Sequence, residues 1–588
     1  MTANFRIFFW ALLAMALFVN YQTWTHDYPS VPTSSTGLAG GPPGAALDSS
    51  APTANAPNAS PAAAPGATTT PATTTTPAAT TAPAATTAQA ATTAQAGASP
   101  AALEAAAAAP GAGHVHVRTD VLDVDVSLAG GELDRVDLPA YPLAKNTPDL
   151  PVRLLNRDGA DSLFVVQTGL AGTSEELAPT HQALFTADLQ DLRLTPGQDE
   201  LRLPLHWSDG HGLTVTKTLI FHRGAYQIGL EYQIHNGGIA PWTFAPYEQI
   251  LRYNTPIERS YFRVDSYAFK GPAISDGKKY QKLDITKAAT LDQSVTDGWI
   301  AALQQHFVTA IVPPSDVPYR FTLKTQGNEF LLAATGPSQT VPAQGNATVG
   351  ANLWVGPKLQ TQLDQVGPKL SLVTDYGKLS VLSTPLFWLL DRVHRVVGNW
   401  GFTIIIVTLL LKLLFYPLSE ASGRSMAKMK ALAPRLNSLR ETYKDDREKL
   451  NRGMMELYQR EKVNPLAGCL PMVIQIPVFL AFYWVLRDSV EIRQAPFIFW
   501  INDLSSRDPY FVLPALMAAA MFVQYKLNPQ VGDPMQQKVF MFMPLAMSVT
   551  FAFFPAGLVL YWVTNTVLSI LQQWNINRRI EARGRSKR

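Results

Sequence analysis

Long apolar segments dominate the last third of the chain. Five of them lie at about residues 400–418, 466–486, 510–527, 537–554 and 556–574. Each comes close to the ~20 residues that a helix needs to cross the hydrocarbon core of a bilayer. Lipid offers no partners for unpaired backbone groups, so segments of this kind are expected to enter a membrane as helices.

A sixth apolar run, from Ile7 to Val19, lies within residues 1–24 and follows Arg6. A cleaved signal peptide would end in a site of small residues. Here the run is followed by bulky residues such as Tyr21 and Trp24, which are typical of membrane interfaces. We therefore interpret residues 1–24 as an uncleaved signal-anchor span. Six spans in all would place both termini on the same side of the membrane.

The segment 25–113 has a different composition from the rest of the chain. From Pro29 onward it consists almost wholly of Ala, Thr, Pro, Gly and Ser, and Asp48 and Glu104 are its only charged residues. Such a segment has no apolar face whose burial could offset the entropy cost of ordering it. We expect a disordered periplasmic tether.

Residues 114–374 show the alternating pattern of half-buried strands. In the run 224–234 one face carries Tyr226, Ile228, Leu230, Tyr232 and Ile234. Similar short runs occur at 115–128, 213–221, 319–324 and 329–334, separated by Gly, Pro, Asn and Asp. This spacing predicts a β-sandwich of antiparallel strands. The chain has one cysteine, which excludes a disulfide scaffold, so the sandwich must depend on its core.

Residues 375–398 carry apolar side chains at helical spacing. They are Leu379, Leu382, Leu386, Leu389, Leu390, Val393 and Val396. Charged residues such as Asp391 and Arg392 fall mostly on other faces, which predicts an amphipathic helix in the membrane interface. The alternative is an ordinary helix packed on the sandwich.

The distribution of basic residues orients the spans. The segment 419–464, which reads as a helical hairpin turning near residues 444–446, contains eleven Lys and Arg residues, and the tail 576–588 contains six. The opposite loop, about 487–509, contains three. Loops rich in Lys and Arg remain in the cytoplasm. We therefore expect the hairpin and the tail in the cytoplasm, and the sandwich in the periplasm between the anchor and the core spans 399–418 and 465–575.

Familiar catalytic signatures are missing from the sequence. It contains neither H-E-x-x-H nor G-x-S-x-G, and no histidine falls inside a predicted span. The net charge of +3 argues against a dedicated DNA-binding protein. We predict no catalytic residue, no metal site and no cofactor, and we do not expect an enzyme.

Lys412 is the residue that most needs an explanation. It lies in the apolar segment 400–418, and a lysine near the centre of a spanning helix costs ~2.5–3.5 kcal/mol on insertion scales. Such a side chain either faces a wet cavity or extends to the nearby cytoplasmic interface. Thr408 lies four residues earlier on the same helix face, which favours a polar stripe.

Polar side chains also occur in the other predicted spans. Gln475 and Gln524 lie in two of them, and the last span contains a stripe of Tyr561, Trp562, Asn565, Thr566, Ser569, Gln572 and Gln573. Such groups must face protein or water rather than lipid. Hydrogen bonding between helices would explain them. Together with Lys412 and the lack of acidic residues in the spans, they also indicate a hydrated cavity of positive potential that would attract acidic or polar peptide.

Several stretches of the sequence are distinctive. In the C-terminal third they are FYPLSEASGRSMAKMKALAP (415–434), VNPLAGCLPMVIQIPVFLAFYWVL (463–486), DPMQQKVFMFMP (533–544) and FPAGLVLYWVTNTVLSILQQ (554–573). In the predicted periplasmic part they are GWIAALQQHFVTAIVP (298–313), LWVGP (353–357) and DYG (375–377). Together these stretches resemble the bacterial membrane-protein insertases of the YidC/Oxa/Alb family, in the Gram-negative form that has a large periplasmic domain.

This resemblance implies a multi-pass α-helical membrane protein. It would have six spans, a five-helix insertase core and a periplasmic all-β supersandwich domain. The core would form a groove that opens to the cytoplasm and to lipid. Lys412 matches the basic position of that groove, where many relatives have arginine, and lysine keeps the charge but lacks the bidentate fork. By the same matching, the groove-lining positions are Thr408, Gln475, Gln524, Tyr561 and Trp562.

The resemblance also implies a function in the bacterial inner (cytoplasmic) membrane. The protein would insert, fold and help assemble membrane proteins, alone or with the Sec translocon (SecYEG and SecDF). Its partners would be nascent membrane proteins, membrane lipids and the ribosome or signal recognition particle pathway. Two other classes stay open: a secondary transporter or channel, and a periplasmic scaffold or binding protein with a membrane anchor. A transporter would usually show two repeated halves, and no internal repeat is visible.

Overall fold

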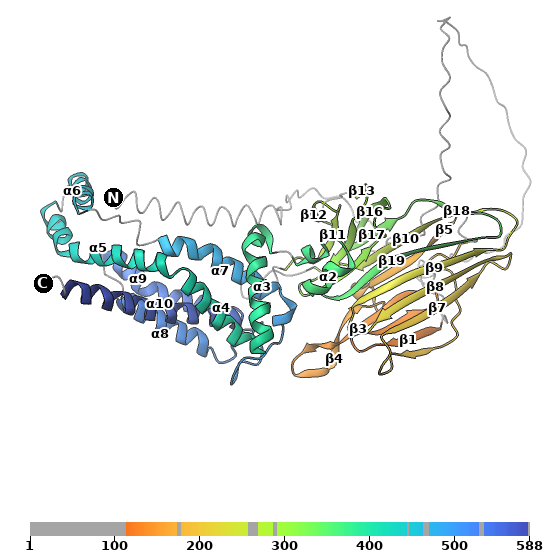
Figure 1. Cartoon of the computed structure of the whole chain (residues 1–588), viewed down its shortest axis with the longest axis horizontal. Helices are drawn as coiled ribbons and strands as arrows, with labels where there is room; N and C mark the ends of the chain where they lie inside the picture. The colour runs from red at the N-terminus through yellow and green to blue at the C-terminus, as the bar shows by residue number, and fades with distance from the viewer. Residues whose placement is uncertain are drawn as a thin grey trace, which may run out of the picture.

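The computed structural model describes residues 113–172, 178–256, 268–285, 291–374, 376–443, 446–461, 470–527 and 534–585. These residues form a β-sheet domain followed by a group of helices, and the two parts lie end to end (Figure 1). The predicted signal anchor, 1–24, and all of the predicted tether except residue 113 lie outside the described residues.

The described strands of the β-domain form two sheets. The larger has the order β13 (Leu291–Val295), β16 (Tyr319–Gln326), β17 (Glu329–Thr335), β10 (Trp242–Tyr253), β5 (Phe164–Gly172), β3 (Glu132–Ala144), β2 (Asp123–Ser127), β1 (His114–Arg118) and β6 (Asp191–Arg193), with β18 (Gln339–Val341) on β10 and β4 (Thr147–Leu155) on β3. The smaller has the order β12 (Tyr280–Lys282), β11 (Gly271–Ser275), β14 (Trp299–Leu303), β15 (Phe307–Val312), β19 (Gly345–Pro357), β9 (Gln227–Asn236), β8 (Leu213–His222) and β7 (Glu200–Ser208). Described neighbours pair antiparallel, as the sequence predicts, except that β1 and β6 are parallel.

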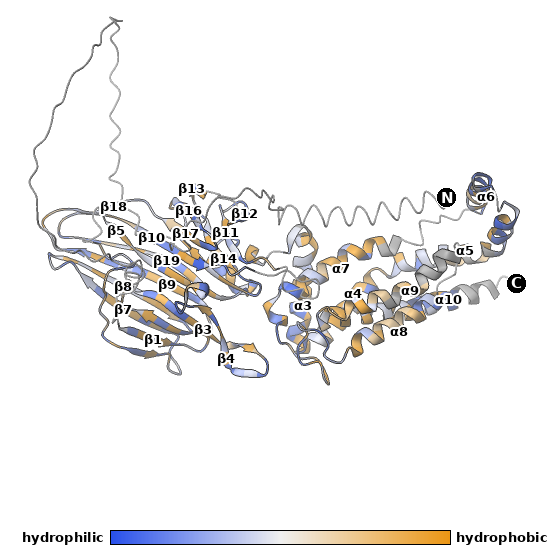
Figure 2. Ribbon diagram, turned by 180° about the vertical axis from the view of Figure 1, so that it is seen from behind, coloured by the Kyte–Doolittle hydropathy of each residue, from blue (hydrophilic) through white to orange (hydrophobic). Residues whose placement is uncertain are grey.

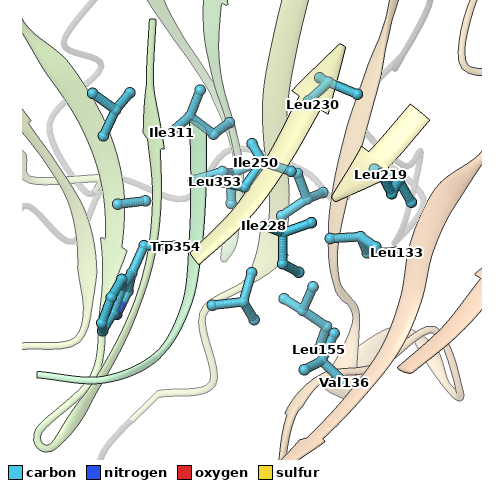
Figure 3. Close-up of a cluster of buried hydrophobic side chains, with 14 of the residues drawn as sticks. Leu133, Val136, Leu155, Leu219, Ile228, Leu230, Ile250, Ile311, Leu353 and Trp354 are labelled. Carbon is cyan, nitrogen blue, oxygen red and sulfur yellow. The ribbon is translucent and has the colours of Figure 1, made fainter. Parts of the chain in front are cut away.

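The core of the domain lies between the two sheets. Figure 3 shows Leu133, Val136 and Leu155 from the larger sheet facing Leu219, Ile228, Leu230, Leu353 and Trp354 from the smaller one. The alternating face predicted in 224–234 is confirmed, because Tyr226, Ile228, Leu230, Tyr232 and Ile234 are all 4% exposed or less. Each large apolar side chain buried in this way contributes ~1.5–3 kcal/mol. The predicted all-β domain is therefore correct.

Helices make up the rest of the described chain. They are α2 (Gln360–Val366), α3 (Ser380–Val397), α4 (Trp400–Leu414), α5 (Tyr416–Thr442), α6 (Arg447–Arg460), α7 (Leu470–Asp488), α8 (Val512–Leu527), α9 (Pro534–Phe551) and α10 (Ala556–Arg585). Short 3₁₀ turns lie at Ala160–Ser162, Leu370–Val373, Gly377–Leu379 and Val490–Ile492. α10 packs on α4 and α8, and α8 packs on α9. Figure 2 shows α4, α7 and α8 as mostly hydrophobic, whereas α6 is largely hydrophilic.

The described helices differ in one respect from the long spans that the sequence suggests. None of them is by itself long and apolar enough to cross a membrane, although α4 and the part of α5 up to Met429 meet that requirement as a pair bent by 63°. The break is at Phe415, directly before Tyr416 and Pro417 at the start of α5. Pro417 has no N–H to donate to the carbonyl of Leu413, four residues earlier, and its ring clashes with that carbonyl, which explains the bend. The expected six spans and five-helix core stay a prediction.

Helix α3 occupies the segment for which an interfacial helix is predicted. Its buried face, formed by Ser383, Leu386, Phe387 and Leu390, packs on α4 and α7. Its opposite face exposes apolar side chains: Val381 is 85% exposed, Trp388 57% and Val396 87%. α3 therefore covers one end of the helical group and leaves an apolar face uncovered by described protein (Figure 1).

Candidate functional site

Helix α4 carries Lys412. The N-terminus of α4 packs against the loop that joins α7 to α8. The Asn399 side chain caps the helix by accepting hydrogen bonds from the backbone N–H of Gly401 and Phe402, at 2.9 and 3.2 Å. A Cβ at Gly401 would lie 2.0 Å from the ring of Phe497, so only glycine allows this close contact. Lys412 follows three turns later, in the last turn of the helix.

The ammonium group of Lys412 is directed at α10. Its Nζ donates a hydrogen bond to Oγ of Ser569 at 2.7 Å, and that hydroxyl donates to the backbone carbonyl of Asn565, also at 2.7 Å. Within the described part of the chain, no carboxylate lies within ion-pair distance of Lys412. The charge is therefore held in place by a neutral hydroxyl and is not neutralised by an acidic partner.

Lys412 lines a recess between α4, α5, α7 and α10 that has an empty volume of about 470 Å³. The polar lining residues are Thr408, Lys412, Ser419, Gln475, Tyr561 and Asn565. The apolar ones are Leu411, Phe415, Leu418, Ile474 and Val478. Apolar walls with a few converging polar groups are typical of binding sites for flexible or small ligands. The recess thus combines one positive charge with several hydrogen-bonding groups.

Three more of the predicted groove residues lie in this recess. The Thr408 hydroxyl donates to the carbonyl of Ile404 at 2.6 Å, which leaves its oxygen free to accept. The Gln475 side chain hydrogen-bonds with the hydroxyl of Tyr561, whose ring stacks on Phe482 at a centroid distance of 4.3 Å. Lys412, Thr408, Gln475 and Tyr561 thus line one recess although they come from three different helices, and their role in a substrate groove stays a prediction.

The other two predicted groove residues do not line the recess. Trp562 belongs to an aromatic cluster, with its ring centroid 4.7 Å from that of Phe479 and 5.2 Å from that of Phe551. Gln524 lies on α8, a helix that contributes no residue to the lining. Tyr561 and Trp562 are adjacent in the chain and therefore point to different sides of the helix, which explains why two residues of similar character have different surroundings.

The structure adds polar residues that the predicted set of groove residues omits. Ser569 holds Lys412, Asn565 lines the recess, and Ser419 lines it from the first turns of α5. The signal for two of them is present in the sequence, because Asn565 and Ser569 lie four residues apart on one face of the last apolar segment. Ser419 carries no comparable signal, since the bend between α4 and α5 brings it to the recess.

The chemistry available in this recess is binding by charge and hydrogen bonds. Within the described ranges, no group of three or more His, Cys, Asp or Glu side chains has the arrangement of a metal site. The lining residues supply a cation, two hydroxyls, a phenol and two amides. Such a set can accommodate carboxylate and peptide groups that have left water.

Models of known families match both parts of the chain. Residues 392–583 match the model described as 60Kd inner membrane protein, and residues 114–389 match the model described as YidC periplasmic domain. The fold and the two matches define a class: a bacterial inner membrane protein with a periplasmic β-domain.

Curated relatives give the family. The membrane protein insertase YidC of Thioalkalivibrio sulfidiphilus is 48% identical over 82% of this chain and 88% of its own length. That of Nitrosococcus oceani is 40% identical over 99% of this chain and 100% of its own length. The chain belongs to the YidC family of membrane protein insertases. Among solved structures, an active YidC insertase aligns with 78% of this chain and 94% of its own, at 16% identity and a TM-score of 0.35.

Proposed function

We propose that this protein inserts membrane proteins by binding the polar segments of its substrates in the recess. The observation that carries the proposal is the position of Lys412, a cation in an apolar helix that lines the recess with a hydroxyl as its partner. A polar segment in hydrocarbon loses its hydrogen bonds to water, at a cost of several kcal/mol for each unpaired group. The recess would replace part of those bonds and so lower the barrier to crossing.

The apolar part of a substrate would leave by a different surface. α7 exposes Val473, Ile474, Ile476 and Leu480, and α9 exposes Met541, Phe542 and Met543. Ile474 also lines the recess, so a wall of the recess continues into the apolar face of α7. An emerging apolar segment would slide along these two helices into lipid. Burial in the bilayer would supply most of the drive, and the membrane potential would act on charged tails.

The proposed topology follows from the basic residues and the helices together. Six spans would include the N-terminal anchor and a five-helix core built from α4, α7, α8, α9 and α10. The α5–α6 hairpin, in which Met429 and Leu436 pack against Met454 and Tyr458, would lie in the cytoplasm with both termini. There it could receive nascent membrane proteins from the ribosome or the signal recognition particle pathway. The Sec translocon (SecYEG and SecDF) would be a partner within the membrane.

Photocrosslinking in cells tests the role of the recess. A photoreactive amino acid at position 412 is expected to crosslink to a ribosome-stalled nascent membrane protein. The matched control is position 526, because Lys526 is also a lysine on an apolar helix but lies outside the recess, with Nζ 4.8 Å from the ring of Phe522. Equal yields at the two positions, or insertion without any crosslink at 412, would contradict the proposal.

A further inference from the structure

The hairpin formed by β3 and β4 extends beyond the β-sandwich toward the helices (Figure 1). At its tip, Lys145 donates hydrogen bonds to the backbone carbonyls of Gln494 and Asn502. Both acceptors belong to the α7–α8 loop, residues 489–511. The tip of the hairpin therefore contacts the loop that links two apolar helices.

Side chains of the loop also hold the hairpin. Nη2 of Arg493 donates to the carbonyls of Pro142 and Leu143, at 2.9 and 3.2 Å, and Nε2 of Gln494 donates to Pro142 at 3.1 Å. The Arg493 guanidinium lies 5.6 Å from the ring of Phe307, on the sandwich itself. The hairpin donates hydrogen bonds to the loop and the loop donates hydrogen bonds to the hairpin. Together these contacts fix the position of the hairpin relative to the ends of α7 and α8.

In the proposed topology, in which α7 and α8 span the membrane, the α7–α8 loop marks the level of the membrane surface. It joins the end of α7 at Asp488 to the start of α8 at Val512, and its irregular backbone cannot lie in hydrocarbon. Asp508 accepts hydrogen bonds from the indole N–H of Trp500 and from two backbone N–H groups near the start of α8. Whatever is clamped to the loop lies at the same level.

Large apolar side chains are exposed at this level. On the hairpin, Leu143 is 64% exposed and Leu150 56%, and on the loop Phe499 is 83% exposed. On α3, the guanidinium of Arg392 lies 5.6 Å from the ring centroid of the exposed Trp388. Leu, Phe and Trp beside basic groups are typical of surfaces that enter the boundary between headgroups and acyl chains. The described part of the chain leaves more than half of each leucine uncovered.

We propose that the tip of the β3–β4 hairpin inserts Leu143 and Leu150 into the periplasmic leaflet of the inner membrane. The lipid surface is the occupant that the position favours, because the hairpin is hydrogen-bonded to a loop that must itself lie at that surface. The β-sandwich is thereby attached at two kinds of contact: by hydrogen bonds to the α7–α8 loop and by leucine side chains to lipid. This inference rests on the proposed topology of α7 and α8, but it does not depend on the recess at Lys412.

Spin labels on the full-length protein test the proposal. The natural cysteine is removed as Cys469→Ser, and single cysteines are introduced as Leu143→Cys or Leu150→Cys and labelled with a nitroxide. The protein is placed in vesicles of phosphatidylethanolamine and phosphatidylglycerol. Oxygen concentrates in the acyl region and a nickel chelate stays in water, so the ratio of the two collision rates reports depth. Both labels are expected to give a ratio several-fold higher than a water-exposed control.

Ile239 supplies the matched control, as Ile239→Cys. It is 100% exposed in the connection between β9 and β10. The start of β9 lies near the hairpin, since Tyr226 contacts Tyr141 at 6.3 Å between ring centroids. Residues rise ~3.3 Å each along a strand, so the end of β9 at Asn236 lies roughly 30 Å from that contact. A label there stays in water.

The collision rates separate the outcomes. A ratio at 143 and 150 equal to that at 239 overturns the proposal. A fall in both collision rates together means that a protein surface, such as a second copy, covers the leucines, and it overturns the lipid assignment as well. Leu143→Ser in the chain labelled at 150 is expected to move the ratio toward the control value. Because the readout is depth, loss of insertion activity leaves the result unaffected.

Discussion

Two lysines, one in each part of the molecule, show how differently the two architectures treat the same side chain. Lys217 lies between the sheets, is fully buried, and donates to the backbone carbonyls of Gly130 and Thr168 at 2.7 and 3.4 Å. Lys412 donates to a serine hydroxyl and borders a recess of about 470 Å³. The sandwich closes around its lysine, whereas the helices leave theirs accessible. Accessibility is what makes a buried cation useful for binding.

The surroundings of Lys217 also include an acid. Burial lowers the pKa of Lys217 to about 7 and raises the pKa of Glu248 to about 8, and each charge partly offsets the shift of the other. Among the described residues, no donor reaches Oε2 of Glu248. A fully enclosed pair of this kind affects the stability of the domain and its dependence on pH. It has no route to a substrate.

The largest effect is expected from reversing the charge in the recess. Lys412→Glu should reduce insertion of substrates with acidic translocated tails at least tenfold, because a carboxylate repels those tails, whereas Lys412→Arg should retain most of the activity. Insertion is measured by protease protection in cells depleted of the native protein. Lys526→Glu is the control outside the recess. Equal insertion by the Lys412→Glu and Lys412→Arg variants would refute the role of the charge.

Removal of Lys217 should lower the stability of the β-domain and not act on the recess. Lys217→Ala leaves the carbonyls of Gly130 and Thr168 without their donor and opens a cavity, and a large-to-small change of this kind in a core costs ~2–5 kcal/mol. Hydrogen exchange of the full-length protein should show loss of protection in β8 and β10. Lys412→Ala should leave these strands protected. Unchanged exchange in the Lys217→Ala variant would mean that the enclosure of this lysine contributes little.

Glu248 should give the sandwich a pH dependence that Glu248→Gln removes. The pKa of this carboxyl is raised from 4.5 to about 8 in the folded state by burial, so its protonated form favours folding. Its contribution is fully present below pH 4.5 and is lost as the pH rises through 8. Lys217, with its pKa lowered from 10.5 to about 7, acts in the opposite sense, with stability lost as the pH falls from 10.5 through 7.

Thermal unfolding of the full chain between pH 5 and 8 measures this effect. The unfolding temperature of the β-domain should fall with pH in the native protein, by a few degrees for each kcal/mol. It should fall less in the Glu248→Gln variant. A parallel pH dependence in the two proteins would show that Glu248 does not titrate in this range.

The smallest effect is expected at the partner of Lys412. Ser569→Ala removes the hydroxyl that accepts from Nζ, but water in the open recess can take its place, so a loss of ~0.5–1 kcal/mol is expected. Insertion should fall two- to fivefold, and Ser569→Thr should restore it. The control is Ser438→Ala, because that exposed serine donates only within α5. A loss as large as that of Lys412→Glu would mean that Ser569 does more than hold the lysine.

The strands could be predicted from the alternation of apolar and polar residues, because this alternation shows which face of a strand is buried. The five alternating residues of the run 224–234 are buried as expected. The same alternation places Lys217 on the inward face of β8, with Val215 and Leu219, so its burial was also readable from the sequence. Its closeness to Glu248 was not, because β8 and β10 belong to different sheets and only their packing brings the two side chains together.

The recess was predictable in part. Helical spacing placed Thr408 on the same face as Lys412, and both line it. Ser569, which accepts the hydrogen bond from Lys412, lies 157 residues from Lys412 in the chain. The contact exists only because α10 packs on α4 at the level of Lys412. Trp562 and Gln524 have the polar character of groove residues, yet neither lines the recess. Helical periodicity groups residues into faces, but it does not say which face meets which helix.

The sequence by itself determined the two-part organisation, the alternating core of the β-domain, the charge asymmetry of the loops and the presence of Lys412 in an apolar segment. These features are local, because they depend on periodicity and composition within one segment. Only the tertiary structure decided that Ser569 holds Lys412, that Lys217 is enclosed near Glu248, and that the β3–β4 hairpin is clamped by Arg493. Each of these contacts joins segments far apart in the chain. Their geometry is therefore a property of packing, which no single segment encodes.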